Sequence, residues 1–220
     1  MILEGVYRRF VPLRAGKGPL DARMTHAESL AVAQVEPEGY ELTRAGRRFY
    51  VAYNGTGPTG IAPVVALPTT AAQWAIWNAD PSKSYVVTYL GAFLSAGTPG
   101  AGGILLLSCL FKAPAQVGAN ATGLVVANAN GGAIASKAII KSAVVITDPA
   151  AGLWRPTAFQ STEKVTAFPG TNSVIPEWDI KGRLIIQPQS GLALSLMGPT
   201  GTGALYLPMA EWTELESDVE

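Results

Sequence analysis

The sequence predicts an all-β protein: an antiparallel β-sandwich of jelly-roll or Greek-key type that carries an extended N-terminal arm. Short runs rich in aromatic and β-branched residues recur along the chain, separated by turn residues, with 24 Gly and 16 Pro in total. The longest apolar run, residues 104–111, is far shorter than the roughly 18–20 residues that a membrane-spanning helix needs. At 220 residues a sandwich usually remains one domain, so we expect an arm at residues 1–50 and a sandwich at 51–220.

The first 50 residues differ in composition from the rest, because they carry half of the 16 basic side chains. A Gly-Lys-Gly-Pro sequence at 16–19 indicates a hinge, and Thr25 and Glu28 have the spacing of a helix capping box. Residues 29–35 fit the periodicity of a helix and of a strand equally well, so both interpretations stay open. We expect the arm to be partly extended and to end near Gly46.

Beyond the arm, strand patterns follow one another with few helical patterns between them. The expected strands lie at 48–53, 73–78, 84–94, 104–111, 123–128, 138–146, 154–156, 164–168, 182–188, 191–197, 204–208 and 210–215. In the strand at 191–197, Leu192, Leu194 and Leu196 alternate with smaller residues, which predicts one buried face. The strands at 84–94 and 104–111 are expected to pair as neighbours.

Two glycine-rich segments, 97–103 and 198–203, resemble phosphate-binding loops only superficially. Each lies between two strand patterns, lacks the Gly-Lys-Ser/Thr ending and opens no helix that would hold an anion. We therefore expect hairpin loops there.

Residues 51–136 contain only three ionised side chains, Asp80, Lys83 and Lys112. We expect Asp80 and Lys83 at the solvent-exposed tip of a tight turn. Because interface cores are depleted of charge, the stretch predicts walls that neighbouring protein covers. The formal net charge is zero, which gives no overall basic excess for binding nucleic acid.

Catalytic and metal-binding signatures are weak in this chain. Its single cysteine, Cys109, stands in an apolar run and is expected to be a small buried side chain rather than a reactive thiol. Its single histidine, His26, has no partners at metal-ligand or triad spacing and is expected to be an exposed polar residue. We therefore expect no metal, no cofactor and no enzymatic activity.

The aromatic residues leave more than one interpretation open. Glu177 and Asp179 flank Trp178, the arrangement of a glycoside hydrolase only if a substrate groove adjoins them. Five tryptophans can form a sugar-stacking surface, but in a β-protein they more often anchor a core or an interface. The candidate interface residues are Arg8, Arg9, Phe10, Trp74, Trp77, Trp178 and Trp212.

Two segments carry a resemblance to a known class of protein. They are the block at 182–212, which opens Gly-Arg-Leu-Ile-Ile-Gln-Pro and closes Leu-Tyr-Leu-Pro-Met-Ala-Glu-Trp, and the segment Trp-Asn-Ala-Asp-Pro-Ser-Lys-Ser-Tyr at 77–85. Together they resemble small jelly-roll virion proteins of tailed bacteriophages, of the head cement, decoration or fibre-base class. The resemblance implies a non-enzymatic subunit, often trimeric, that clamps capsid proteins together, with the arm lashing over a neighbour.

The expected function is that of a capsid cement or decoration subunit, with copies of itself and the major capsid protein as partners. The expected location is the virion, assembled in the host cytoplasm, since the N-terminus lacks a signal-peptide pattern. We expect no nucleic-acid or membrane partner. One alternative is a receptor- or glycan-binding tip that uses the loops at 54–60, 95–103 and 198–203; another is a hydrolase that uses Glu177 and Asp179.

Overall fold

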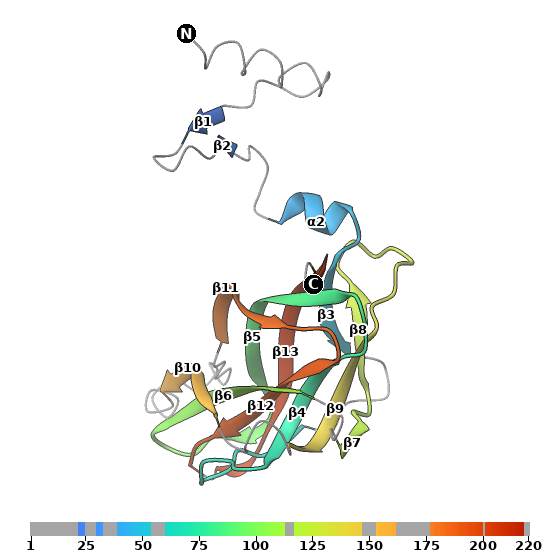
Figure 1. The fold of residues 1–220 in the computed structure, drawn as a ribbon. Coiled ribbons are helices and arrows are strands. Elements are labelled where there is room, and N and C mark those ends of the chain that lie inside the picture. The colour runs from blue at the N-terminus through green and yellow to red at the C-terminus, as the bar shows by residue number, and fades with distance from the viewer. Residues whose placement is uncertain are drawn as a thin grey trace, which may run out of the picture. The chain divides into compact units, whose positions relative to one another are not determined.

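The computed structural model describes residues 22–24, 30–32, 39–53, 60–112, 117–146, 153–161, 177–199 and 201–217 (Figure 1). The chain divides into two compact units, Met1–Arg44 and Ala45–Glu220. The division falls before the strand that starts at Arg48, because that strand pairs within the second unit.

The described part of the first unit holds an antiparallel pair and one short helix. Strand β1 (Ala22–Met24) pairs with β2 (Leu30–Val32), so the ambiguous segment at 29–35 contains a strand. Thr25, His26 and Glu28 lie outside the described residues. Helix α2 (Tyr40–Arg44), which the sequence analysis did not predict, begins after Gly39, whose carbonyl accepts hydrogen bonds from the backbone and hydroxyl of Thr43.

The second unit is the predicted sandwich. Its strands are β3 (Arg48–Tyr53), β4 (Ala71–Asn78), β5 (Lys83–Thr98), β6 (Gly103–Lys112), β7 (Val117–Asn120), β8 (Leu124–Asn128), β9 (Ala138–Val145), β10 (Arg155–Ser161), β11 (Glu177–Ile186), β12 (Ser190–Met197) and β13 (Thr202–Glu216). The expected strand at 164–168 lies outside the described residues, and β7 was not expected. The all-β sandwich is therefore confirmed.

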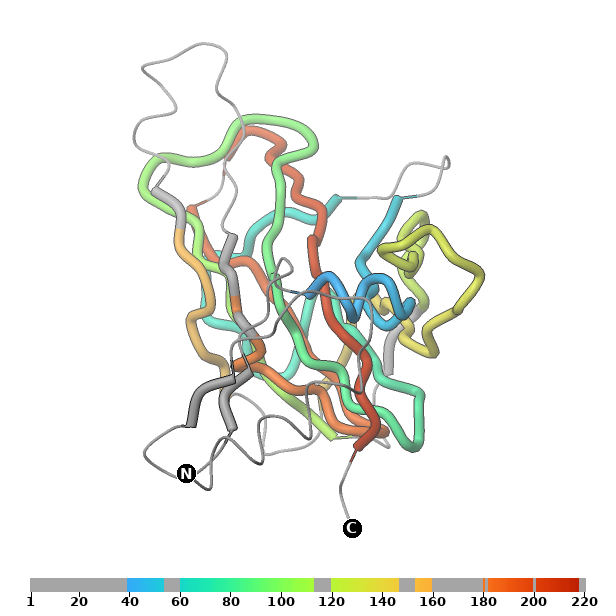
Figure 2. The backbone as a smooth tube through the Cα atoms, turned by 90° about the horizontal axis from the view of Figure 1, so that it is seen from above, coloured from blue at the N-terminus to red at the C-terminus, as the bar shows by residue number. Residues whose placement is uncertain are grey.

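The strands form a six-stranded sheet, in the order β10-β6-β12-β4-β9-β7, and a five-stranded sheet, in the order β11-β5-β13-β3-β8 (Figures 1 and 2). All pairs in both sheets are antiparallel, and no two neighbours are consecutive in sequence, so most connections cross between the sheets. This is connectivity of the Greek-key type.

Two expectations about connections were wrong. The strands expected at 84–94 and 104–111 became β5 and β6, which lie in opposite sheets instead of pairing. The glycine-rich segments at 97–103 and 198–203 each link one sheet to the other, so they are not hairpin loops. Gly97 (φ +75°) requires glycine there, since a Cβ atom would lie 2.1 Å from the carbonyl oxygen of Gly203.

The core lies between the two sheets. Leu192, Leu194 and Leu196 of β12 lie in it and are at most 1% exposed, which confirms the predicted buried face. The opposite face of β12, which was expected to stay open, is buried as well, since Ala193 and Ser195 are both 0% exposed. From the opposite sheet, Trp212 stacks against Phe49 and Tyr85 at ring-centroid distances of 6.4 and 6.0 Å. Large aromatic side chains thus fill the space between the layers.

A second apolar layer covers the outer face of the six-stranded sheet. It is formed by side chains that alternate with the core residues of the same strands, among them Trp77 of β4, Cys109 and Phe111 of β6, and Val144 of β9. The Trp77 and Phe111 rings lie 6.0 Å apart, and the indole N–H of Trp154 donates to the carbonyl of Thr69 across the layer. Cys109 is a buried free thiol whose pKa burial raises, which confirms the predicted burial of this side chain.

The charge-poor stretch has a partly internal explanation. Strands β4, β5 and β6 come from it and contribute much of the core, where charged side chains are rare. Its exposed residues at 65–67, 95–98 and 130–135 are also uncharged, however. Burial within one chain therefore does not account for them, and their cover by neighbouring protein stays a prediction.

Candidate interaction surfaces

Three of the predicted interface tryptophans are core residues. Their rings are buried inside the chain, since Trp74, Trp77 and Trp212 are 2%, 5% and 0% exposed. The expectation that they meet a partner was wrong, because each belongs to one of the two apolar layers described above. An exposed surface has to be built from other residues.

The remaining predicted residues are placed only in part. Arg8, Arg9 and Phe10 lie outside the described residues. Trp178 belongs to β11, where Glu177 pairs in register with Gly91 and Asp179 with Tyr89, but the side chains of these three β11 residues are outside the description. The register thus places the backbone of the acidic pair beside β5, whose Tyr89 lines an exposed hollow.

The hollow lies where two strands of the five-stranded sheet, β3 and β13, separate. Strand β3 pairs with β13 only from Arg48 to Tyr50, and the chain returns to β13 when Ile61 pairs with Tyr206. Between these contacts, residues 207–210 of β13 have no paired residue on the β3 side within the described part of the chain. The sheet therefore has a gap in its hydrogen-bonded ladder.

This gap explains how β13 accommodates Pro208. Its carbonyl accepts a hydrogen bond from the hydroxyl of Tyr53 on β3, which shows that the backbone polar groups of Pro208 face β3. A strand interior normally excludes proline because its missing N–H leaves a ladder bond unmade. Here the missing N–H falls on the side where β3 has left, so no buried acceptor loses its donor.

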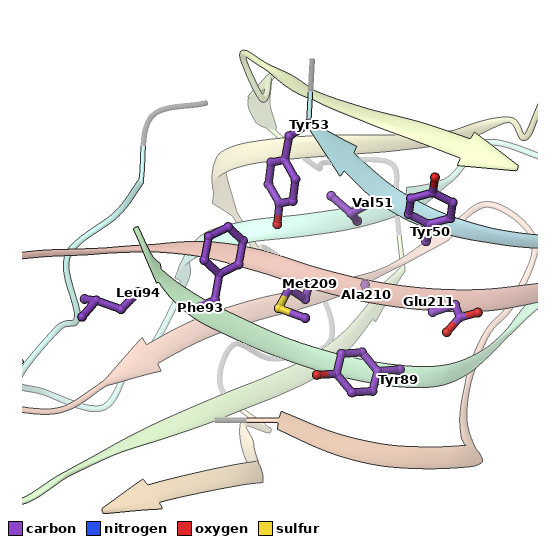
Figure 3. Close-up of a pocket in the computed structure, with 9 residues that line it drawn as sticks. All are labelled: Tyr50, Val51, Tyr53, Tyr89, Phe93, Leu94, Met209, Ala210 and Glu211. Carbon is purple, nitrogen blue, oxygen red and sulfur yellow. The ribbon is translucent and has the colours of Figure 1, made fainter. Parts of the chain in front are cut away.

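Aromatic side chains line the hollow, which has a volume of about 670 Å³ (Figure 3). We call it the aromatic hollow; its lining residues are Tyr50, Val51, Tyr53, Tyr89, Phe93, Leu94, Met209, Ala210 and Glu211. In Figure 3 the rings of Tyr53 and Phe93 face each other across the gap, above Met209. These two rings meet edge-on at a centroid distance of 5.5 Å.

The hollow is open to solvent, and its charges nearly cancel. Tyr50 and Tyr53 are 41% and 38% exposed, and partial burial raises the pKa of Tyr53 to about 12, so its phenol stays protonated at neutral pH. Glu211 lies in register between Tyr89 and Tyr50, and it forms an ion pair with Arg48. The one carboxylate among the lining residues is therefore already matched by a guanidinium.

A second exposed surface is apolar and lies beside the six-stranded sheet. The four most exposed large apolar side chains of the described residues are Val65, Leu67, Leu153 and Phe159, at 68%, 56%, 76% and 64%. We call them the apolar patch. The hydrogen bond from Trp154 to Thr69 holds Leu153 near the segment of Val65 and Leu67, and Phe159 lies on the edge strand β10.

Two buried carboxylates lock one end of the sandwich and correct the expected position of Asp80. Asp80 is 3% exposed instead of lying at a solvent-exposed tip, because its carboxylate accepts hydrogen bonds from the backbone and hydroxyl of Ser82 and pairs with Lys137 at 3.4 Å. Burial raises its pKa, but the Ser82 bonds and the Lys137 ammonium outweigh burial and lower the pKa overall.

Glu214 of β13, also 3% exposed, is the second of these carboxylates. It pairs with Lys83 at 3.4 Å and accepts a hydrogen bond from Ser136. Together, Asp80 and Glu214 fasten the loop before β9 to both sheets. Since every charge in this group has a partner that holds the fold, we assign the group a structural role.

Neither the aromatic hollow nor the apolar patch was predicted from the sequence as a site, although two signals for the hollow were present. Tyr85, Tyr89 and Phe93 recur along one strand, and Pro208 interrupts another, which together indicate a ladder that opens beside aromatic rings. The apolar patch has no comparable signal, because exposed and buried valines and leucines look alike in a sequence.

The described residues show neither a metal-binding cluster nor a membrane-spanning helix. Across the described ranges, no cluster of three or more His, Cys, Asp or Glu side chains is arranged to hold a metal ion. None of the helices in those ranges has the length and apolarity to cross a membrane. No protein-family model, curated protein or solved structure matches the chain.

Proposed function

We propose that this protein is a non-enzymatic structural subunit of a bacteriophage virion, a cement or decoration protein that bridges shell proteins. Its partners are copies of itself, in a trimer, and the major capsid protein. The observation that carries the proposal is the exposure of the apolar patch, because its four large apolar side chains are 56–76% exposed in a single chain and would leave water when a protein partner covers them.

Two further features support the proposal. The exposed segments at 65–67, 95–98 and 130–135 carry no charged side chain, as is typical of interface cores. The zero net charge also means that copies of the chain meet without overall electrostatic repulsion. A Greek-key sandwich preceded by a separate N-terminal unit suits a subunit that sits on a shell and reaches a neighbour.

The proposal is tested by the mass of the native particle and by substitutions in the patch. Light scattering coupled to size exclusion should give three times the mass of one chain. Leu153→Glu and Phe159→Glu should each weaken the trimer at least tenfold, because a buried unpaired carboxylate is costly. Val125→Glu, at a 42% exposed position on β8, is the matched control and should leave the trimer intact.

The second measurement is co-sedimentation with empty shells of the major capsid protein. Wild-type protein should sediment with the shells and raise the temperature at which they burst. A monomer at all accessible concentrations that also fails to bind shells would contradict the proposal, as would patch variants that assemble and bind like wild type.

A further inference from the structure

We infer that the aromatic hollow between β3 and β13 binds a neutral oligosaccharide, with a pyranose ring stacked on tyrosine and its hydroxyl groups at the phenolic and Glu211–Arg48 rim. The inference goes beyond the structural role proposed above and does not depend on it. The hollow uses no residue of the apolar patch, so the two surfaces are open to different partners.

The chemistry of the lining selects this class of ligand. A pyranose presents C–H groups on its faces and hydroxyls around its edge, and aromatic rings with a polar tip match both. The hollow provides three tyrosines and one phenylalanine around a Met209 floor, with Tyr50 and Tyr53 more than one-third exposed. Its volume of about 670 Å³ lies within the roughly 300–1,000 Å³ typical of ligand pockets.

The charges around the hollow argue against other ligands. Among the described residues that line the hollow, Glu211 is the one charged side chain and is paired with Arg48, so this lining offers no unpaired cation for a phosphate or a nucleic acid. A single carboxylate is also too few for a metal site. A neutral, hydroxyl-rich molecule remains the best match.

The backbone argues against an extended peptide. A peptide that added itself to β13 would need free N–H and C=O groups along residues 207–210. Pro208 has no N–H, and its carbonyl already accepts the Tyr53 hydroxyl. The strand edge in the hollow is therefore a poor template for main-chain pairing.

One ring of the hollow, that of Tyr53, is also held in place before a ligand arrives. Tyr53 is fixed at its hydroxyl by Pro208 and at its ring by Phe93. Ordering a side chain on binding costs free energy, and this cost is largely avoided where packing already sets the rotamer. A rigid aromatic wall therefore favours stacking.

The test is an array of neutral hexose and N-acetylhexosamine oligosaccharides, probed with the full chain. We expect a signal with a subset of them, and titration calorimetry with the strongest should give a Kd that Tyr50→Ala weakens at least tenfold. Tyr50→Phe, which keeps the ring, should weaken it less than threefold. Tyr40→Ala is the matched control, because Tyr40 is 45% exposed on α2, outside the hollow, and should not change the Kd.

Three results would overturn the inference. The first is an array without signal above background, and the second is binding that survives Tyr50→Ala unchanged. The third is capture of peptides, but not of glycans, in a manner that Tyr50→Ala abolishes. Circular dichroism and the unfolding midpoint of each variant establish that a lost signal does not reflect a lost fold.

Discussion

The outer faces of the two sheets differ in how well they are packed. The six-stranded sheet carries apolar residues on both faces, so Trp77, Cys109 and Phe111 form a second layer that is at most 5% exposed. The five-stranded sheet interrupts its own ladder beside Pro208 and leaves tyrosine rings open to solvent. One sheet is thus closed by packing, whereas the other keeps a hollow.

The contrast teaches where each sheet is free to change. A close-packed layer responds to the gain or loss of a single methylene group, while a wet hollow tolerates substitution until a ligand has to bind. Stability should therefore be sensitive to residues of the six-stranded sheet's outer layer, and recognition to residues of the hollow.

The largest expected effect compares the two tryptophans that represent the two apolar layers. Trp212→Ala in the inter-sheet core and Trp77→Ala in the outer layer should each lower the free energy of unfolding by about 3–5 kcal/mol, because both rings are fully enclosed. Urea unfolding monitored by circular dichroism measures both. A cost below about 1 kcal/mol for Trp77→Ala would show that the outer layer is not a packed core.

The next effect probes how closely that layer is packed. Gly191→Ala would place a Cβ atom 2.4 Å from the Phe111 ring, so it should cost about 1–3 kcal/mol. Combining it with Phe111→Leu, which withdraws the ring, should recover part of this cost and give a measurable coupling energy. If the two substitutions are simply additive, the ring is not what excludes the methyl group.

A third effect concerns the joint between the sheets. Asp80→Asn removes the charge that pairs with Lys137 and should destabilise the protein by about 1–3 kcal/mol near pH 7. Because the folded pKa of Asp80 lies below its unfolded value, this stabilisation is complete above the unfolded pKa and is lost as the pH falls toward the folded one.

Urea unfolding of both proteins between pH 7 and pH 2.5 checks this sign. The difference between wild type and Asp80→Asn should shrink below about pH 4, near the ordinary pKa of an aspartate. A difference that stays constant or grows on acidification would contradict the assigned role of the carboxylate.

Local sequence patterns predicted the strands better than their partners. Leu192, Leu194 and Leu196 announce a buried face because alternation is a property of the strand itself. Which sheet β5 and β6 join depends on long-range pairing, which alternation does not encode, so they were wrongly placed side by side. Likewise, 204–208 and 210–215 were separated at Pro208 but form one strand, since the ladder gap makes proline acceptable there.

The candidate residues show the same limit. Tryptophan was expected at an interface because it is large and amphipathic, but the same size makes Trp74, Trp77 and Trp212 the best fillers of the two layers. Asp80 was expected in solvent, together with Lys83, because the charged residues of a tight turn usually lie there. Its burial depends on Lys137, which is distant in sequence and joins it only in the folded chain.

The smallest effect isolates the hydrogen bond that holds the hollow open. Tyr53→Phe keeps the edge-on contact with Phe93 but removes the donor to the Pro208 carbonyl, so it should cost about 0.5–1.5 kcal/mol. Tyr50→Phe, at the other side of the hollow, should change stability by less than about 0.5 kcal/mol, because nearly half of that side chain is in water. If the two substitutions cost the same, the Tyr53 bond does not fix the wall. Since a rigid wall is what favours stacking, Tyr53→Phe should then also leave oligosaccharide affinity unchanged, whereas a fixed wall predicts that stability and affinity fall together.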